Sequence, residues 1–577
     1  MRQHPEHDNM AFQLATYIRS RADAYLNDFR RMTQQAEKIF VDRNWPRMQA
    51  LTRERIDLYK NLVQGAEIEI RNTYPERIHL VATWESAKGI YGDLIRDRDD
   101  GQIAATVFNS LSRRILSTIG HNPAAEFSTE TSADNIPEIP PDQCFHYRVD
   151  RISADAIKGL LSKYAFLPPD YRPDRDSRSI TDCISRHLTT ENQKLSGATM
   201  EMLKSPFYRG RGAYLVGRIQ TCDRMFPLVI AFENTAAGLT ADAVLLTEKA
   251  VSILFSFTRS YFFVDAFPCT HVIRFLMALL PQKRLAELYI AIGFNKHGKT
   301  ELFRDLTAQL SSCSGDEFDI SAGKKGLVMI AFNMPRDDMV FKVIRDRFGH
   351  PKTTTRQQVM DKYNYVFRHD RAGRLLDAQV FEHLKIDRCH FSGNLLGELI
   401  QETQKSVKIM ADSIILDTCY VERRVTPLDL YLREGSPAQN RAAVIDLGNA
   451  IKDLAASNIF PGDMLIKNFG VTRHGRIVFY DYDELCPLTD CRFRQIPQPR
   501  NEMEALSDQP WYHVGENDVF PEEFKLFLGL PGHLRHIFTT THADLFQVAF
   551  WQVTQQHIRS GTWIPIYPYE SELRLYS

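Results

Sequence analysis

Three polar residues near the C-terminal end of the chain have types and spacings that suit the transfer of phosphate. Asp463 is followed five residues later by Asn468, and Asp481 follows thirteen residues after that. Phosphate transfer depends mainly on positioning and on neutralising charge. One carboxylate faces the attacking hydroxyl, while an amide and a second carboxylate hold a divalent metal on the phosphates. The spacing therefore predicts that Asp463 is the base and that Asn468 and Asp481 bind Mg²⁺ or Mn²⁺.

Catalytic loops of protein kinases have this spacing, with a short hairpin between the asparagine and the second aspartate. Residues 469–472 and 476–480 can form such a hairpin. The flanking residues differ from the usual pattern: Pro461-Gly462 replaces His-Arg, and Tyr482-Asp483 replaces Phe-Gly. The sequence thus predicts an atypical kinase-like site.

Two features upstream of this run could hold a nucleotide. Lys342 is the central lysine of the apolar run VFKVI, and a kinase lysine in such a strand contacts the α- and β-phosphates. A glycine-containing loop precedes the strands, and glycines let backbone N–H groups approach phosphate closely. A solvated lysine and an ordinary turn are the alternatives. Together the features predict that ATP contacts Lys342 and the loop residues Ser321, Ala322, Gly323, Lys324, Lys325, Gly326 and Leu327.

The elements around these residues follow the order of a bilobal kinase domain. Residues 326–333 and 338–344 predict a pair of strands, and helical segments then lead to a further strand at 414–421. A helix over 439–456 runs into the Asp463 loop. The order of strand pair, helix, strand, helix, catalytic loop and hairpin is the one that kinase-like domains use.

The N-terminal half has a different pattern. Residues 10–125 predict long amphipathic helices, because apolar residues recur mostly at three- and four-residue steps. Residues 123–141 are rich in Pro, Ser, Thr and acidic side chains and predict a linker or an ordered loop. Residues 247–263 predict one buried helix, and three β-like runs precede it at 213–219, 227–232 and 243–246.

The expected fold class is therefore α+β, with a mostly helical domain over residues 1–317 and a kinase-like domain over 318–577.

The composition is ordinary for a soluble protein, with 44% hydrophobic and 25% charged residues among 577. A formal net charge of −1 gives no overall field that would recruit nucleic acid or an anionic membrane. Arg259 and Asp265 interrupt the most apolar stretch, and the first residues lack a signal-peptide pattern. Nine cysteines without a CxxC pair fit reduced thiols. We expect a cytoplasmic enzyme that uses neither nucleic acid nor membrane as a partner.

Three rival functions stay open on the residues alone. The run GFNKHGKT over residues 293–300 satisfies GxxxxGK[ST], so a P-loop NTPase could use Lys299 and Thr300. The run VFYDYDEL resembles the start of aspartyl-phosphate phosphatases, although Leu485 does not fit the last position. A kinase-like scaffold without catalysis is the third, and the retention of Lys342 and of the Asp463 motif argues against it.

Longer runs resemble bacterial isocitrate dehydrogenase kinase/phosphatase. The runs that carry the resemblance are VFKVIRDRF (340–348), HDRAGRLLDAQVFE (369–382), YVERRVTPLDLYL (420–432), NIFPGDMLIKNFGVTRHGRIVFYDYDE (458–484) and DVFPEEF (518–524). This resemblance implies a helical regulatory domain, a kinase-like catalytic domain, and an enzyme that phosphorylates and dephosphorylates a serine of isocitrate dehydrogenase. It also implies control of flux between the tricarboxylic acid cycle and the glyoxylate bypass, the use of ATP or ADP with Mg²⁺, AMP as an effector, and a possible homodimer.

The resemblance also assigns residues. It places the nucleotide loop at 321–327, the ATP-binding lysine at Lys342 and an active-site aspartate at Asp377, with the adenine hinge near 420–424. The glutamate that usually pairs with the kinase lysine is not identifiable from the sequence, and Glu382 is the candidate.

Two further expectations concern the reverse reaction and docking. Removing phosphate with a metal-bound water needs an extra carboxylate to orient that water, which Asp377 or Asp483 could supply. Residues 497–523 are rich in proline and acidic side chains and contain Trp511-Tyr512. This segment could anchor a folded substrate or could simply pack on the catalytic domain.

Overall fold

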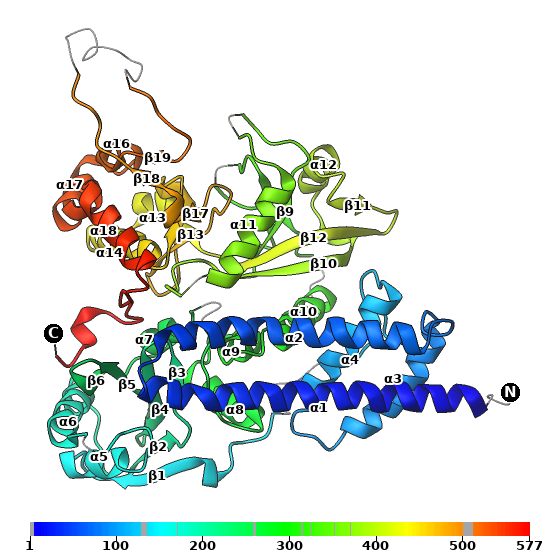
Figure 1. Cartoon of the computed structure of the whole chain (residues 1–577), viewed down its shortest axis with the longest axis horizontal. Coiled ribbons are helices and arrows are strands. Elements are labelled where there is room, and N and C mark those ends of the chain that lie inside the picture. The colour runs from blue at the N-terminus through cyan, green and yellow to red at the C-terminus, as the bar shows by residue number, and fades with distance from the viewer. Residues whose placement is uncertain are drawn as a thin grey trace. The chain divides into compact units, whose positions relative to one another are not determined.

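The computed structural model describes residues 5–127, 136–169, 171–257, 261–312, 315–323, 325–350, 352–369, 371–499 and 512–576; the side chains of residues 5–8 and 369 are outside this description. The chain divides into two compact units. The first is Met1–Ser314 together with Pro568–Ser577, and the second is Gly315–Tyr567. Figure 1 colours the first unit from blue to green, with its last residues in red, and the second from green to red.

The first unit begins with four helices: α1 (Pro5–Val41), α2 (Trp45–Thr73), α3 (Val81–Ile95) and α4 (Gly101–Leu116). In Figure 1, α1 and α2 are the two long blue helices that run side by side. The apolar faces of the four helices bury a common core that includes Trp84 and Phe108. Asn44 caps α2, because its side chain accepts a hydrogen bond from the backbone N–H of Arg47. The amphipathic helices predicted for residues 10–125 are confirmed.

A six-stranded antiparallel sheet follows, in the order β1-β2-β4-β5-β6 with β3 beside β4. Its strands are β1 (Cys144–Val149), β2 (Ala198–Leu203), β3 (Phe207–Arg209), β4 (Gly212–Gln220), β5 (Met225–Thr235) and β6 (Gly238–Leu245). The three predicted β-like runs lie in β4, β5 and β6. Val216 and Val229 face one hydrophobic core, while their neighbours Leu215 and Ile230 face another. Both faces of the sheet are therefore buried, which is why these strands are apolar without alternation.

Helices cover the two faces of this sheet. One core contains residues of α5 (Ala154–Leu161) and α6 (Pro173–Thr190), and the other contains residues of α8 (Cys269–Leu279) and α9 (Leu285–Ala291). α10 (Asn295–Ser312) closes this part of the chain. Within the tail that follows Tyr567, the side chains of Tyr569 and Arg574 both bond the carboxylate of Asp242, so the last residues belong to this unit.

The single buried helix predicted for residues 247–263 is wrong. Thr247 caps a short helix, α7 (Glu248–Leu254), and the described residues after it include an extended segment around Phe262 and Phe263. The N–H of Phe262 donates to Ala291 O at 2.8 Å, and Phe263 forms a β-bridge with Tyr208. An unbroken apolar run signals burial, and burial suits an extended segment as well as a helix.

The second unit has the two lobes of a kinase-like domain. The first lobe is a six-stranded sheet in the order β10-β12-β9-β8-β7, with β11 beside β12. Its strands are β7 (Asp319–Ile320), β8 (Met329–Asn333), β9 (Met339–Ile344), β10 (Ala378–Asp387), β11 (Val407–Ile409) and β12 (Ser413–Arg423). Two helices accompany it, α11 (Arg356–His369) and α12 (Gly393–Glu402).

The helical segments predicted between the second and third strands are present as α11 and α12, but the long strand β10 lies between these helices and was not predicted. His383 has a φ of 53°, and the pairing with β12 skips this residue between Glu382 and Leu384. Asp417 on β12 is skipped as well, so the register does not change, but Glu382 and His383 are both exposed, and this breaks the two-residue alternation by which a strand is recognised in a sequence.

The second lobe is mainly helical. α13 (Leu428–Glu434), α14 (Pro437–Ala456), α16 (Phe524–Phe527), α17 (Gly532–Thr541) and α18 (Val548–Arg559) surround a core centred on Trp551. Between them lie the short strands β13 (Thr426–Pro427), β14 (Ile459–Phe460), β15 (Phe469–Val471), β16 (Ile477–Phe479), β17 (Cys486–Pro487), β18 (Arg492–Phe493) and β19 (Asp518–Val519). The predicted hairpin is β15–β16. The α+β class with a kinase-like second unit is confirmed. Among the residues described, no helix is long and apolar enough to cross a membrane.

Candidate active site

A cavity of about 960 Å³ in the second unit collects most of the residues that the sequence singled out. Its walls come from the glycine-containing loop, β9, the end of β12, the Asp463 loop and the segment after β16. The predicted residues that line it are Ser321, Ala322, Gly323, Lys325, Gly326, Leu327, Lys342, Asp463, Asn468, Asp481 and Asp483. Lys324 lies outside the described residues. Asp377 is not among the residues that line the cavity, but it directly precedes Ala378, which pairs with the cavity residue Glu422.

Lys342 is held by an ion pair between two strands of the first lobe. Its Nζ lies 2.6 Å from Oε2 of Glu422 on β12 and donates to the backbone oxygen of Tyr480 at 3.1 Å. Tyr363 from α11 donates to the other oxygen of Glu422 at 3.4 Å. Only 1% of the Glu422 side chain and 12% of the Lys342 side chain are exposed. Burial raises the pKa of Glu422, and the Lys342 ammonium opposes this shift.

Glu422, rather than Glu382, is therefore the carboxylate that pairs with this lysine, and the candidate named from the sequence is wrong. Glu382 is exposed on β10, opposite Thr418. In the pairing of β12 with β9, Tyr420 lies opposite Lys342 and Glu422 lies opposite Val340. Residues two apart on a strand share a face, so the register itself brings Glu422 and Lys342 together diagonally.

The glycine-containing loop needs glycine at two positions. Gly323 has a φ of 120°, which side chains rarely adopt, and a Cβ on Gly326 would lie 2.6 Å from Met329 O. Ser321 fixes the start of the loop, because its hydroxyl donates to Asn333 Oδ1 at 2.7 Å. Lys325 pairs with Glu398 at 3.0 Å, on α12. Ser321 and Lys325 thus fasten the loop to the first lobe, and its described residues line the cavity.

The Asp463 loop explains one departure from ordinary kinases. Gly462 has a φ of 76°, and a Cβ there would lie 2.5 Å from Glu484 O. The arginine of the usual His-Arg pair would clash with this backbone, so the glycine lets the loop pass close to the segment after Asp481. The amide of Asn468 donates to Asp463 O at 3.1 Å, and Asp463 Oδ1 accepts the N–H of Leu465 at 3.2 Å.

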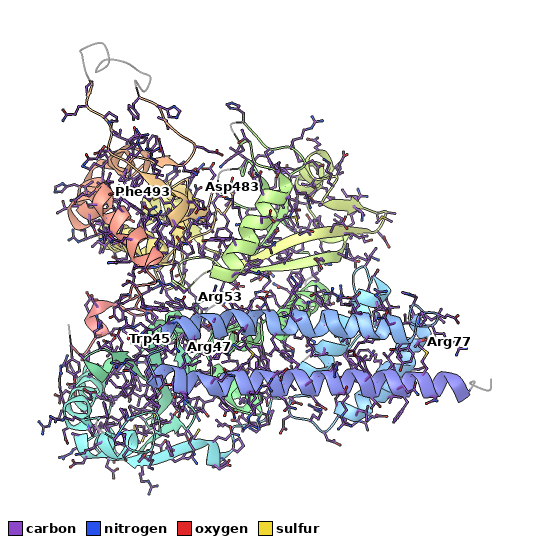
Figure 2. All side chains as sticks on the ribbon, in the orientation of Figure 1. Trp45, Arg47, Arg53, Arg77, Asp483 and Phe493 are labelled. Atoms are coloured by element: carbon purple, nitrogen blue, oxygen red, sulfur yellow. The ribbon has the colours of Figure 1, made fainter. Side chains whose placement is uncertain are left out.

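Asp481 and Asp483 form a close carboxylate pair beside this loop. Burial and the neighbouring Asp483, which shares a hydrogen bond with it, raise the pKa of Asp481 to about 7. Nζ of Lys352 lies 2.9 Å from Oδ2 of Asp483 and also pairs with Glu484. Asp483 is labelled in Figure 2. Burial lowers the pKa of Lys352, but its bonds to Glu484 and Asp483 outweigh this and raise it above the ordinary value. Lys352 comes from the segment between β9 and α11, and no motif in the sequence marked it.

The residues present fit a divalent cation of the Mg²⁺ type. In the described part of the chain, no three His, Cys, Asp or Glu side chains are gathered to hold a metal by themselves. Mg²⁺ is commonly held by one or two carboxylates, with phosphates and water as its other ligands. Asp481 and Asn468 offer a carboxylate and an amide oxygen in one cavity, and two crowded carboxylates are stabilised by a cation.

The run GFNKHGKT does not form a phosphate-binding loop. α10 begins at Asn295, so most of the run is helix, and Gly298 packs so tightly that a Cβ would lie 2.6 Å from Ala286 O. His297 is buried and bonds the hydroxyl of Thr106 through Nδ1 at 2.8 Å. A P-loop cradles phosphate with the backbone that precedes its helix, and here that backbone is already wound into the helix. The P-loop reading is therefore wrong.

The proposed docking segment is described only in part. Trp511 lies outside the described residues. Tyr512 packs on Phe520, with ring centroids 5.1 Å apart. The strand β18, which precedes the segment, pairs in parallel with β19 within it. Leu526 and Phe527, which follow it in α16, are 72% and 59% exposed, which is unusual for such large apolar side chains.

Known proteins match this chain over nearly its full length. Residues 316–571 match the family described as the isocitrate dehydrogenase kinase/phosphatase (AceK) kinase domain, and residues 15–314 match the regulatory domain of the same family. An isocitrate dehydrogenase kinase/phosphatase of Anaeromyxobacter sp. (strain Fw109-5) is 44% identical over 572 residues, with 99% of each chain covered. Proteins of the same name from Anaeromyxobacter dehalogenans (strain 2CP-C) and Serratia proteamaculans (strain 568) are 41% and 38% identical, over 99% and 96% of this chain and 99% and 94% of theirs.

Among solved structures, a ROP18 kinase domain in complex with AMP-PNP and sucrose matches 45% of this chain and 90% of its own, at 10% identity and a TM-score of 0.22. That score is too low to support an argument. The matches of sequence are sufficient without it: both family domains, in order and over nearly the full length, show that this chain belongs to the isocitrate dehydrogenase kinase/phosphatase family.

Proposed function

We propose that this chain phosphorylates a serine of isocitrate dehydrogenase and also removes that phosphate, and so controls flux between the tricarboxylic acid cycle and the glyoxylate bypass. The observation that carries the proposal is the single cavity shared by Lys342, Asp463, Asn468 and Asp481. These groups are the ones that phosphate transfer needs. Relatives with this name are 38–44% identical over nearly the whole chain.

The roles we propose follow from the contacts. Lys342, steadied by Glu422, holds the α- and β-phosphates of ATP, and the loop over residues 321–327 covers them. Asp463 accepts the proton of the substrate hydroxyl. Asn468 and Asp481 hold the divalent cation, which when bound neutralises charge on the phosphates.

For the reverse reaction we propose a role for the second carboxylate, Asp483. Lys352 holds Asp483 beside the cavity, where its carboxylate can orient a water molecule toward phosphoserine. Asp377 is the alternative, since it directly precedes Ala378, which pairs with Glu422 at the same wall. ADP as the acceptor of the phosphate is a second route that uses the same residues.

Several finer statements belong to the proposal. We propose that residues 1–317 regulate and residues 318–577 catalyse, that AMP is an effector, and that the protein is cytoplasmic and can form a homodimer. Isocitrate dehydrogenase is its protein partner, and nucleic acid and membrane are not. The segment over residues 497–523, with the exposed Leu526 and Phe527 after it, is the surface that we propose for docking the substrate.

The deciding experiment measures both directions with purified proteins. Labelled ATP and Mg²⁺ are expected to transfer phosphate to isocitrate dehydrogenase, and the label is expected to leave the product when ADP is added. Asp463→Ala serves as the matched control, and it should lose transfer while keeping its thermal stability. A folded wild-type protein that transfers no phosphate to isocitrate dehydrogenase would contradict the proposal.

A further inference from the structure

Two cysteines lie in contact just beyond the Asp481–Asp483 pair. Cys486 belongs to β17 and Cys491 follows the short helical turn η5 (Leu488–Asp490). Their sulfur atoms are 3.6 Å apart, and both thiols are free. In the described part of the chain, this is the one thiol–thiol contact among the hydrogen bonds. The nine cysteines showed no CxxC spacing, so the pair was not visible in the sequence.

The turn between the two cysteines is held in place from outside. Gln555 on α18 donates to Leu488 O at 2.7 Å and to Cys491 O at 2.8 Å, and Arg559 donates to Thr489 O at 2.9 Å. The approach of the two sulfur atoms is therefore fixed by the surrounding fold and does not depend on a mobile loop.

The surroundings also distinguish the two thiols. The hydrogen bond between the two sulfur atoms lowers the pKa of Cys486; burial opposes this shift, and the ammonium of Lys362 adds to it. The same bond, together with burial, raises the pKa of Cys491. Lys362 is fixed nearby, because its Nζ donates to Leu485 O at 2.6 Å. Cys486 is half-buried and Cys491 is 8% exposed, so a small oxidant reaches Cys486 first. A thiolate is the reactive form of cysteine, and Cys486 has the greater thiolate character.

We propose that Cys486 and Cys491 form an oxidation site, at which a hydroperoxide converts the two thiols into a disulfide that acts on phosphate transfer. The Cys486 thiolate attacks one peroxide oxygen, the O–O bond breaks, and a sulfenic acid and hydroxide form. The Cys491 sulfur then attacks the Cys486 sulfur, the S–O bond breaks, and water leaves with the Cys491 proton. Two thiols lose two electrons, hydrogen peroxide gains them, and two waters are produced.

The link to the active site is the strand pair β14–β17. Cys486 pairs directly with Phe460, which is followed after two residues by Asp463, and Glu484 passes within reach of Gly462. A disulfide bond is about 2 Å long, so closing it draws Cys486 toward Cys491 and away from its present place opposite Phe460. Both the Asp463 loop and the Asp481–Asp483 segment are attached to this strand pair. Oxidation is therefore expected to reduce phosphate transfer, and a reductant is expected to restore it.

The test uses the full-length protein, reduced and then treated with hydrogen peroxide. Trypsin releases residues 477–492 as one peptide, because Arg476 and Arg492 flank both cysteines and no other Lys or Arg lies between. In the oxidised wild type, mass spectrometry should find this peptide lighter by two hydrogens and closed to alkylation, and dithiothreitol should reverse both. Cys486→Ser should abolish the change. Cys389→Ser, which alters an exposed cysteine of the same unit, should leave it intact.

Phosphate transfer to isocitrate dehydrogenase is measured on the same samples, and this readout rests on the proposed function. We expect a loss of transfer on oxidation in the wild type and in Cys389→Ser, but not in Cys486→Ser. A peptide that stays open to alkylation while Cys389 is oxidised overturns the proposal, and so does a disulfide that leaves transfer unchanged. If the reduced wild type transfers no phosphate at all, the proposed function has failed, and the mass readout then decides the oxidation site alone.

Discussion

Lys342 on β9 pairs with Glu422 on β12 across 2.6 Å, so both charges of this pair come from adjacent strands of one sheet. In ordinary kinases the partner of this lysine comes from a helix, and movement of that helix can break the pair. Here the helix α11 contributes only the Tyr363 hydroxyl, at 3.4 Å from Glu422. Strand register therefore brings the two charges of this pair together, and the helix adds one hydrogen bond to Glu422.

The first prediction is that Glu422→Gln weakens the use of ATP. The neutral glutamine no longer compensates the charge of the Lys342 ammonium, and we expect this loss to cost about 1.5–3 kcal/mol. Such a cost corresponds to a roughly 10- to 100-fold fall in kcat/KM for ATP. Steady-state kinetics at varied ATP measure it. Glu382→Gln, on the exposed side of β10, is the matched control and should behave as the wild type. Equal behaviour of the two variants would show that the pair does not position the nucleotide.

The second prediction separates the two directions of phosphate transfer. Asp483→Ala should impair dephosphorylation more than phosphorylation. Dephosphorylation needs a carboxylate that orients water, whereas in phosphorylation Asp463 accepts the proton of the substrate hydroxyl. Lys352→Met should show the same imbalance in a milder form, since Asp483 keeps its charge but loses its 2.9 Å partner. Both reactions are assayed on the same preparations with Mg²⁺. Equal losses in the two directions would rule out this division of labour.

The sequence predicted the parts of the site that lie close together along the chain. Asp463, Asn468 and Asp481 belong to one loop and hairpin, and their spacing alone indicated the chemistry. Glu422 and Lys352 were missed because they reach the site through strand pairing and through the packing of a distant segment. Neither relationship has a spacing that can be read along the chain.

The fold shows the same division. Helices over residues 10–125 were predictable because each has its own apolar stripe. Strand β10 was not, since two consecutive exposed residues, Glu382 and His383, break its alternation, and residues 247–263 were misread because an apolar run records burial and not conformation. Local periodicity was informative wherever one element alone determined the pattern.

The third prediction concerns the lysine of the GFNKHGKT run. Lys299→Ala should leave phosphate transfer near the wild-type rate, because residue 299 lies within α10 and not in a loop that could hold a nucleotide. Lys342→Ala should abolish transfer. Transfer rates at saturating ATP compare the two variants directly. A loss of transfer in Lys299→Ala with normal transfer in Lys342→Ala would instead support a P-loop that uses Lys299.

The fourth prediction tests the packing of α14 against α17. A Cβ on Gly448 would lie 2.1 Å from the ring of His542, whose Nε2 bonds Ile445 O at 2.9 Å. The ring cannot move without losing this bond, so Gly448→Ala should destabilise the second unit by about 1–3 kcal/mol. Gly397→Ala on α12 meets nothing within 4 Å and should be neutral or slightly stabilising. Scanning calorimetry gives both shifts, and a stabilised Gly448→Ala would refute the close packing.

The fifth prediction is a loss of stability in the first unit as the pH falls. Burial and the nearby Arg304 lower the pKa of His297 to about 3, whereas an unfolded chain has a histidine pKa near 6.5. Between these values the unfolded state binds a proton that the folded state does not, so stability present above pH ~6.5 declines on acidification by about 1.4 kcal/mol per pH unit. Hydrogen exchange of α10 peptides at several pH values measures the decline. The glutamine of His297→Gln can still bond Thr106 but cannot titrate, so the stability of α10 in this variant should not show the decline that His297 causes. The same slope of stability against pH in both proteins would assign the effect to other groups.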